Sequence, residues 1–295
     1  MTKALPLFIL PLLVGCAAQT SNEDESPVEV EETASTAQAL VSPEYEAIDD
    51  DVNLWRSDLA FCYLTSISGN LLPRTGDEFE VGRGARLGVR SGNWHLWASG
   101  VSASARCAQW ADFKFAGSSK LTSSPEGWWS ASSGRGPVSL WSANTLCFMG
   151  GAGQGYDGGA QRLSVTRDAS GWKLANTGTM IDSGSFLFPS RTPIWASGSA
   201  MCVDTQRSTQ WRLTTHAWSQ GNPQTWMMPS GDGVCMLTGM GGKFGGGGER
   251  VEIVEDSGWW VLRGQSMQHG VQATAQCVPW SQLVITKPII ISPIK

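Results

Sequence analysis

The sequence has few histidines and lacks the catalytic motifs of several common enzyme classes. Its 295 residues include only three histidines, His95, His216 and His269, at different places in the repeats described below. It has no Gly-x-Ser-x-Gly, His-Glu-x-x-His or Cys-x-x-Cys motif, which argues against serine hydrolases, zinc proteases and thiol oxidoreductases. We therefore expect no catalytic residues, no bound metal and no cofactor, and a protein that is not an enzyme.

A phosphate-binding loop is also excluded, although the glycine-rich run from 239 to 248 has a suggestive composition around Lys243. A phosphate loop needs Ser or Thr after the lysine and a helix after the loop, because the helix N-terminus holds the phosphate. Phe244 follows the lysine, and no helical pattern follows the run. A structural turn is the favoured interpretation.

Helical periodicity is missing as well. No window longer than about ten residues in the mature chain keeps a helical pattern without a glycine that breaks it. Short runs with every second side chain apolar are frequent, and glycine-rich turns separate them. The predicted fold class is all-β.

Basic residues are absent from residues 17–51, which carry eleven acidic residues. With few apolar residues, such a segment cannot bury enough surface to offset the entropy of ordering. Residues 16–51 are therefore predicted to be a disordered acidic tether, extended by charge repulsion. The rest of the mature chain has 20 basic and 15 acidic residues, a balance too weak and too dispersed to predict nucleic acid as a partner.

The N-terminus has the layout of a signal peptide, because Lys3 precedes an apolar run too short to span a bilayer. The run ends in Leu13-Val14-Gly15-Cys16, which resembles the lipobox of bacterial lipoproteins. The resemblance implies removal of residues 1–15, acylation of Cys16 and a membrane as the partner of the attached lipid. Because Ala17 rather than Asp follows the cysteine, it also implies an outer-membrane location if the source is Gram-negative.

Six further cysteines divide the rest of the chain into three similar modules. The first cysteine of each module recurs after 85 and then 88 residues. Disulfides are expected in a chain that leaves the cytoplasm, and the repeat favours links within modules, since each module can then close itself. The predicted modules are residues 52–115, residues 116–210 with a leading segment, and residues 211–295 with a C-terminal strand. The predicted disulfides are Cys62–Cys107, Cys147–Cys202 and Cys235–Cys277.

Each module shows the same features between its two cysteines. A glycine-rich turn is followed by an alternating strand with an arginine, then by a Ser-Gly hairpin and a returning strand with a tryptophan. Another tryptophan stands six to nine residues before each opening cysteine. The repeat-equivalent residues are Arg86, Arg162 and Arg250 on the first strand and Trp94, Trp172 and Trp260 on the second, and the preceding tryptophans are Trp55, Trp141 and Trp226.

The sequence leaves the arrangement of the modules open. Three small sheets could be strung as beads or packed with pseudo-threefold symmetry. We prefer the packed form, because isolated modules of this size would leave their tryptophans in water.

The repeated arginines also have two explanations. Each could cover the hairpin tryptophan of its own module through a cation–π contact, or each could bind an anionic ligand with its planar guanidinium. The structural explanation is preferred, because such small cores have few other ways to be sealed.

Tryptophan is unusually frequent, with fifteen copies against three tyrosines. Tryptophan serves both as core bulk and as a stacking surface for sugars. The hairpin tryptophans are predicted to lie in the core. Those outside the shared pattern are the candidates for an exposed ligand-binding surface, namely Trp97, Trp128, Trp129 and Trp218.

The tether, the repeat and the missing catalytic motifs together favour a membrane-anchored, non-enzymatic binding or adhesion protein with a glycan or protein ligand. Two alternatives remain. The modules could form a structural envelope component that binds other copies or cell wall, or the chain could be a hydrolase with an unrecognised site.

Overall fold

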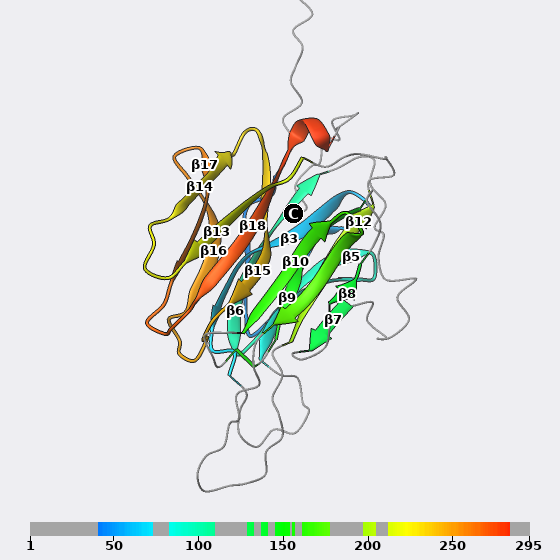
Figure 1. Ribbon diagram of the computed structural model, residues 1–295. Helices are drawn as coiled ribbons and strands as arrows, with labels where there is room; N and C mark the ends of the chain where they lie inside the picture. The colour runs from blue at the N-terminus through cyan, green and yellow to red at the C-terminus, as the bar shows by residue number, and fades with distance from the viewer. Residues whose placement is uncertain are drawn as a thin grey trace, which may run out of the picture. The chain divides into compact units, whose positions relative to one another are not determined.

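The computed structural model of the chain describes residues 41–72, 83–109, 129–132, 137–140, 145–153, 155–156, 161–177, 197–204 and 212–283. In these residues the regular structure is β-strand, apart from one 3-10 turn, η2 (Trp280–Gln282). The strands form three antiparallel sheets of six strands each (Figure 1). The all-β class predicted from the sequence is confirmed. No helix in this part of the chain is long and apolar enough to cross a membrane.

Each module contributes six strands. Module 1 contains β1 (Tyr45–Ile48), β2 (Asp51–Arg56), β3 (Ala60–Gly69), β4 (Gly84–Arg90), β5 (Asn93–Ser99) and β6 (Val101–Gln109). Module 2 contains β7 (Trp129–Ser132), β8 (Val138–Ser139), β9 (Thr145–Ala152), β10 (Arg162–Asp168), β11 (Gly171–Thr177) and β12 (Ser197–Asp204). Module 3 contains β13 (Thr214–Ser219), β14 (Thr225–Pro229), β15 (Gly233–Gly241), β16 (Arg250–Asp256), β17 (Trp259–Gln265) and β18 (Gln272–Pro279).

Every sheet combines strands of two modules. The first, sixth and third strands of one module lie beside the fourth, fifth and second strands of another. The strand orders are β1-β6-β3-β16-β17-β14, β13-β18-β15-β10-β11-β8 and β2-β5-β4-β9-β12-β7. Module 1 therefore pairs with module 3, module 3 with module 2, and module 2 with module 1. The connections form a closed ring with threefold pseudo-symmetry, so the modules are interlocked and are not separate beads.

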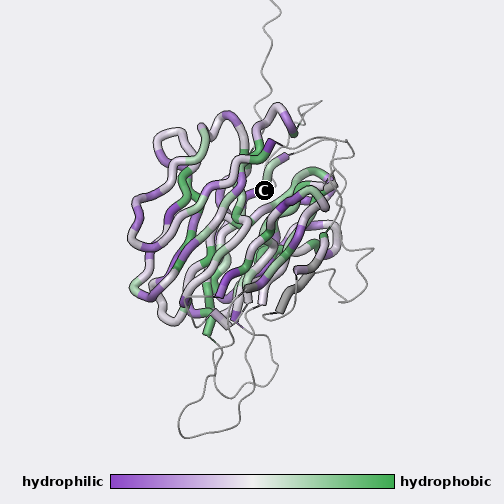
Figure 2. Tube along the Cα trace, viewed as in Figure 1, coloured by the Kyte–Doolittle hydropathy of each residue, from purple (hydrophilic) through white to green (hydrophobic). Residues whose placement is uncertain are grey.

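The third strands, β3, β9 and β15, form the centre of the molecule. They contact one another, and nearly all of their residues are buried. Phe61 of β3 and Phe148 of β9 pack with their ring centroids 6.1 Å apart. Strands β5 and β10 instead alternate buried and less buried residues, and hydrophobic and hydrophilic residues are interspersed along the tube in Figure 2. One hydrophobic core contains residues of all three modules.

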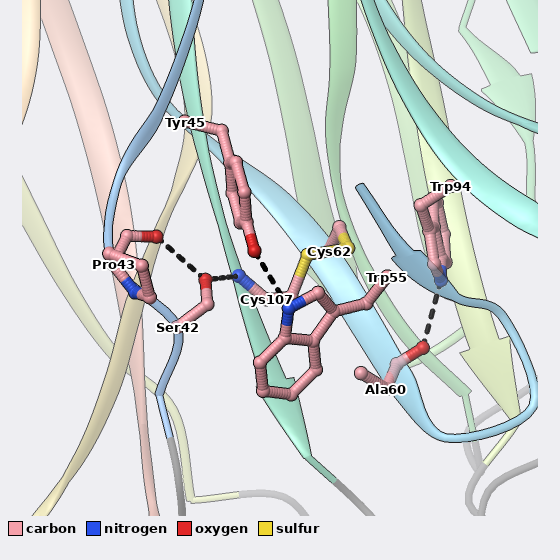
Figure 3. Close-up of a disulfide and its surroundings, with 8 residues drawn as sticks. All are labelled: Ser42, Pro43, Tyr45, Trp55, Ala60, Cys62, Trp94 and Cys107. Atoms are coloured by element: carbon pink, nitrogen blue, oxygen red, sulfur yellow. Dashed lines mark hydrogen bonds between the residues drawn. A yellow bond between two sulfur atoms is a disulfide. The ribbon is translucent and has the colours of Figure 1, made fainter. Parts of the chain in front are cut away.

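The disulfides join the third and sixth strands of each module. They link Cys62 to Cys107, Cys147 to Cys202 and Cys235 to Cys277, which are the pairs that the repeat predicts. In each pair the two cysteines lie directly opposite each other on neighbouring strands. Figure 3 shows the first of them beside Ser42, whose hydroxyl accepts a hydrogen bond from the Cys107 N–H at 2.8 Å.

Each hairpin tryptophan forms a hydrogen bond within its own module, although its strand lies in a sheet with strands of another module. Each indole N–H donates to the backbone carbonyl of the first residue of its own module's third strand. The bonds run from Trp94 to Ala60 at 2.8 Å (Figure 3), from Trp172 to Thr145 at 2.7 Å and from Trp260 to Gly233 at 2.9 Å. All three side chains are buried, as the sequence predicts.

The loops after the third strands hydrogen-bond to one another at the other end of these strands. The N–H of Leu71 donates to the Phe244 carbonyl, the N–H of Phe244 to the Tyr156 carbonyl, and the N–H of Gly155 to the Leu71 carbonyl, at 2.8–2.9 Å. Leu71, Tyr156 and Phe244 each stand nine residues after the first cysteine of their module, and each is fully buried. The glycine-rich run around Lys243 is thus a structural turn that leads into a strand.

Two predicted boundaries need correction. Residues 41–51 are not part of a disordered tether, because β1 and the start of β2 lie there and Ser42 is buried against β6. Module 1 therefore begins before residue 52. The remaining tether, the signal peptide and the predicted C-terminal strand lie outside the described residues.

Candidate functional site

The four tryptophans proposed as ligand-binding residues lie in different environments or outside the described residues. Trp218 is 5% exposed, with its N–H donating to the Asn222 carbonyl and its ring against Gly264, so its assignment to a ligand surface is wrong. Trp97 is half-buried on the outer face of β5. Trp129 begins β7, and Trp128 lies outside the described residues.

The predicted equivalence of the three arginines is also wrong, because Arg86 is two residues out of register. Arg162 and Arg250 lie opposite Gly241 and Ser68, six residues after a first cysteine, whereas Arg86 lies opposite Gly151, four residues after Cys147. The true counterparts of Arg86 are Ser164 and Glu252. A shift of two residues keeps a side chain on the same face of a strand, so the sequence pattern does not expose the error.

The arginines do not cover the hairpin tryptophans of their own modules. The Arg86 guanidinium lies 4.9 Å from the ring centre of Trp97, not Trp94, and Arg250 pairs with Glu252 at 3.0 Å. The guanidinium over a hairpin tryptophan is that of Arg106, 5.2 Å from the Trp260 ring and contributed by another module.

Two other tryptophans are exposed on one face of sheet β1-β6-β3-β16-β17-β14. Trp226 on β14 is 48% exposed, and Trp259 on β17 is 42% exposed. Trp226 lies opposite Val261, which is two residues along β17 from Trp259, so both indoles project from the same face. The pairing has a bulge between Trp226 and Pro229, so β14 takes three steps where β17 takes two between Val261 and Trp259. We call Trp226, Trp259 and the intervening Val261 the aromatic platform.

Val261 shows that the platform is a formed surface. It lies on the face opposite to the buried Trp260 and Leu262 and is not part of the hydrophobic core cluster, yet it is fully buried. Side chains of the outer face must therefore cover it, and the strand register places Trp226 and Trp259 beside it. Val261 therefore lies beneath the surface and is not itself exposed.

The aromatic platform is not part of the repeated pattern. When the modules are aligned on their hairpin tryptophans, the positions of Trp226 and Trp259 are occupied in module 1 by Asn53 and Asn93. The fold is therefore compatible with polar residues at these positions. Tryptophans at 226 and 259 are not needed to complete a module, which separates them from the buried Trp94, Trp172 and Trp260. The earlier match of Trp226 with Trp55 is wrong by two residues.

Charged side chains border the platform on β16 and β17. Glu252 accepts hydrogen bonds from Arg263 at 2.7 Å and pairs with Arg250 at 3.0 Å. Asp256 lies opposite Trp259 on the same face. These four groups carry two positive and two negative charges, so the surface around the indoles is polar but balanced.

A rigid turn fixes Trp259. The preceding Ser257 and Gly258 both have positive φ, 49° and 79°, which suits a tight two-residue hairpin. The N–H of Ser230 donates to the Gly258 carbonyl at 2.9 Å, and its hydroxyl donates to Glu255 at 2.7 Å. Two hydrogen bonds from Ser230 therefore hold the turn that positions Trp259, which favours binding without a rearrangement.

The described residues offer little for catalysis. His95 pairs with Asp51 at 2.9 Å on the outer face of β5 and β2, and burial lowers the pKa of His216, whose Nε2 has no hydrogen-bond partner. No group of three His, Cys, Asp or Glu side chains that could hold a metal occurs among the residues that the structure describes.

Sequence analysis missed both platform tryptophans. Trp226 was assigned to the start of the repeat. Trp259 was passed over because the neighbouring Trp260 matches the hairpin tryptophan of the repeat. Strand alternation holds a usable signal, because neighbouring residues of a strand point to opposite faces. If Trp260 is buried, Trp259 faces outward.

Comparison of the chain with protein-family models gives no match, and comparison with curated proteins gives none.

Proposed function

We propose that this protein is a non-enzymatic binding protein, anchored outside the cytoplasm by a lipid on Cys16, that binds glycans through the aromatic platform. The observation that carries the proposal is the pair of exposed indoles, Trp226 and Trp259, on one face of the neighbouring strands β14 and β17. Flat aromatic rings contact the apolar faces of sugars, and polar groups beside them bond to the hydroxyls. Arg263, Glu252 and Asp256 supply such groups.

A structural role explains the two indoles less well. Module 1 carries asparagine at both positions, so the module fold does not need tryptophan there. A protein ligand remains a possible outcome of the binding experiments, because tryptophan is also enriched in protein interfaces.

The test is binding of the full-length mature protein to a panel of immobilised polysaccharides. Trp226→Asn and Trp259→Asn introduce the residues that module 1 carries at the matched positions, so the variants should fold. We expect each to lose most of the binding. Asn53→Ala and Asn93→Ala are the matched controls and should bind like the unaltered protein. Unimpaired binding by both tryptophan variants, or no binding to any polysaccharide, would refute the proposal.

The lipid anchor has its own test. Replacing Cys16 with Ser removes the thiol that accepts the lipid, so the protein should move from the membrane fraction to the soluble fraction. The measurement is fractionation followed by immunoblotting, and the mature mass should lose the acyl chains. A Cys16→Ser variant that stays in the membrane fraction contradicts the anchor.

A further inference from the structure

We infer that the ligand of the aromatic platform is an uncharged, linear glycan that spans both indoles. This inference rests on the proposed function and specifies the class of glycan. It follows from two properties of the surface, namely the spacing of the tryptophans and the charge of the groups around them.

The spacing favours a chain over a single sugar. Trp226 and Trp259 lie on adjacent strands and project from the same face, and fully buried Val261 lies opposite Trp226 and two residues from Trp259. Two separate stacking surfaces on neighbouring strands can each hold one ring of the same chain. Once one ring is bound, the second contact is intramolecular, so affinity rises with the length of the chain.

The surrounding charge favours an uncharged chain. Arg250 and Arg263 are both engaged by Glu252, at 3.0 and 2.7 Å. Asp256 stands beside Trp259 with no arginine opposite it on β17. A polyanion such as a polyuronate would meet balanced charges at one end of the platform and a carboxylate at the other. Neutral hydroxyls, in contrast, can bond to both the arginine and the carboxylates.

The edge position of β14 leaves room for a long ligand. In the part of the chain that the structure describes, β14 is the last strand of its sheet and pairs with β17. No further strand of this sheet, within those residues, lies in the way of a chain that crosses β17 and β14. This argues for binding within a polysaccharide, and not only at its terminus.

The experiment is calorimetric titration of the mature protein with oligosaccharides of two to six sugars. The probes are cello- and chito-oligosaccharides, which are uncharged, and galacturonate oligomers of the same lengths. We expect an uncharged hexamer to bind about tenfold or more tightly than the dimer. Its affinity should change little between 50 and 500 mM salt, on the order of twofold or less, because screening acts only on charged partners.

Two sets of variants separate the parts of the inference. Trp226→Asn and Trp259→Asn should each remove the gain from dimer to hexamer, because one stacking contact remains. The double variant Glu252→Gln, Asp256→Asn leaves two uncompensated arginines and should gain affinity for the galacturonate hexamer. No gain would show that charge balance does not exclude anions.

The outcomes distinguish failure of the ligand class from failure of the function. Tryptophan-dependent binding in which the galacturonates bind more tightly, and more weakly in high salt, would overturn the uncharged class and leave the platform as a glycan site. Binding of the dimer as tightly as the hexamer would overturn the spanning chain. If no oligosaccharide binds, or if the asparagine variants bind normally, the proposed function fails as well.

Discussion

Trp259 and Trp260 are neighbours in sequence with opposite environments. Trp260 is buried, and its N–H donates to the Gly233 carbonyl, whereas Trp259 is 42% exposed. Because successive side chains of a strand point to opposite faces, one serves the core and the other the outer surface. Two adjacent tryptophans thus have the two roles of this residue type, since one packs in the core and the other offers an exposed stacking surface.

This contrast predicts different effects for the same substitution. Trp260→Phe removes the N–H and leaves the Gly233 carbonyl buried without its partner, so the free energy of unfolding should fall by about 1–3 kcal/mol. Trp259→Phe loses no buried bond and should change stability by less than about 0.5 kcal/mol. Guanidinium denaturation of the two variants measures both values. Equal losses would show that the indole bonds do not hold the hairpins.

At the residue scale the sequence predicts the repeated tryptophans better than the unrepeated ones. Trp94, Trp172 and Trp260 are buried as their shared pattern indicates. The unshared Trp218 is also buried, because it fills the space beside Gly264, a contact between strands that no sequence pattern reveals. Strand alternation indicates that Trp259 faces outward. Whether an unrepeated tryptophan such as Trp218 is exposed depends on distant contacts, which only the structure shows.

At the scale of strands, cysteine spacing is the most informative signal. Each third strand carries a β-bulge three residues after its cysteine, at Thr65, Gly150 and Thr238. Because each third strand has the same features at the same distance from its cysteine, the disulfides and the strands that carry them can be predicted from the repeat. The register of the fourth strands cannot, since a shift of two residues preserves alternation: Arg86 stands four residues before the last paired residue of its strand, whereas Arg250 stands six before its own.

The disulfides predict matched losses of stability. Replacing both Cys147 and Cys202 with Ser should lower the free energy of unfolding by about 2–4 kcal/mol, because the unfolded chain gains freedom. Replacing Cys235 and Cys277 should cost a similar amount, since the loops span 55 and 42 residues. Guanidinium denaturation measures the losses, and peptide mapping without reduction checks the pairs. A Cys107–Cys147 link would contradict the assignment.

The exchange of strands between modules is not predictable from the repeat. Each module contains all six strand types, and its own fourth strand could in principle pair with its own third strand. The structure instead pairs β4 with β9, β10 with β15 and β16 with β3. Local patterns specify strands and hairpins equally well in both arrangements, so only packing among all three modules selects between them.

The contact between modules 1 and 3 closes the ring without a direct chain connection, and a polar cluster marks it. Arg106 stacks on Trp260 and approaches Glu44 and Glu255 at 4.0 and 3.9 Å. Tyr63 lies opposite Arg106, and its buried hydroxyl has no hydrogen-bond partner. Burial raises the pKa of this tyrosine, so the hydroxyl stays neutral. Module 2 carries Phe148 and Met201 at the matched positions.

This asymmetry leads to a prediction about assembly. Arg106 is mostly buried, whereas Glu44 and Glu255 are partly exposed, so these ion pairs add little stability. They favour this pairing over others, because a wrong partner leaves the Arg106 guanidinium without a carboxylate. The double variant Tyr63→Phe, Arg106→Met copies module 2 and should keep the free energy of unfolding within about 1.5 kcal/mol. After refolding at high protein concentration it should form dimers or larger rings in which β16 pairs with β3 of another copy, whereas the unaltered protein should remain monomeric. Light scattering after size exclusion measures this. A variant that refolds only to monomers would show that apolar packing alone closes the ring.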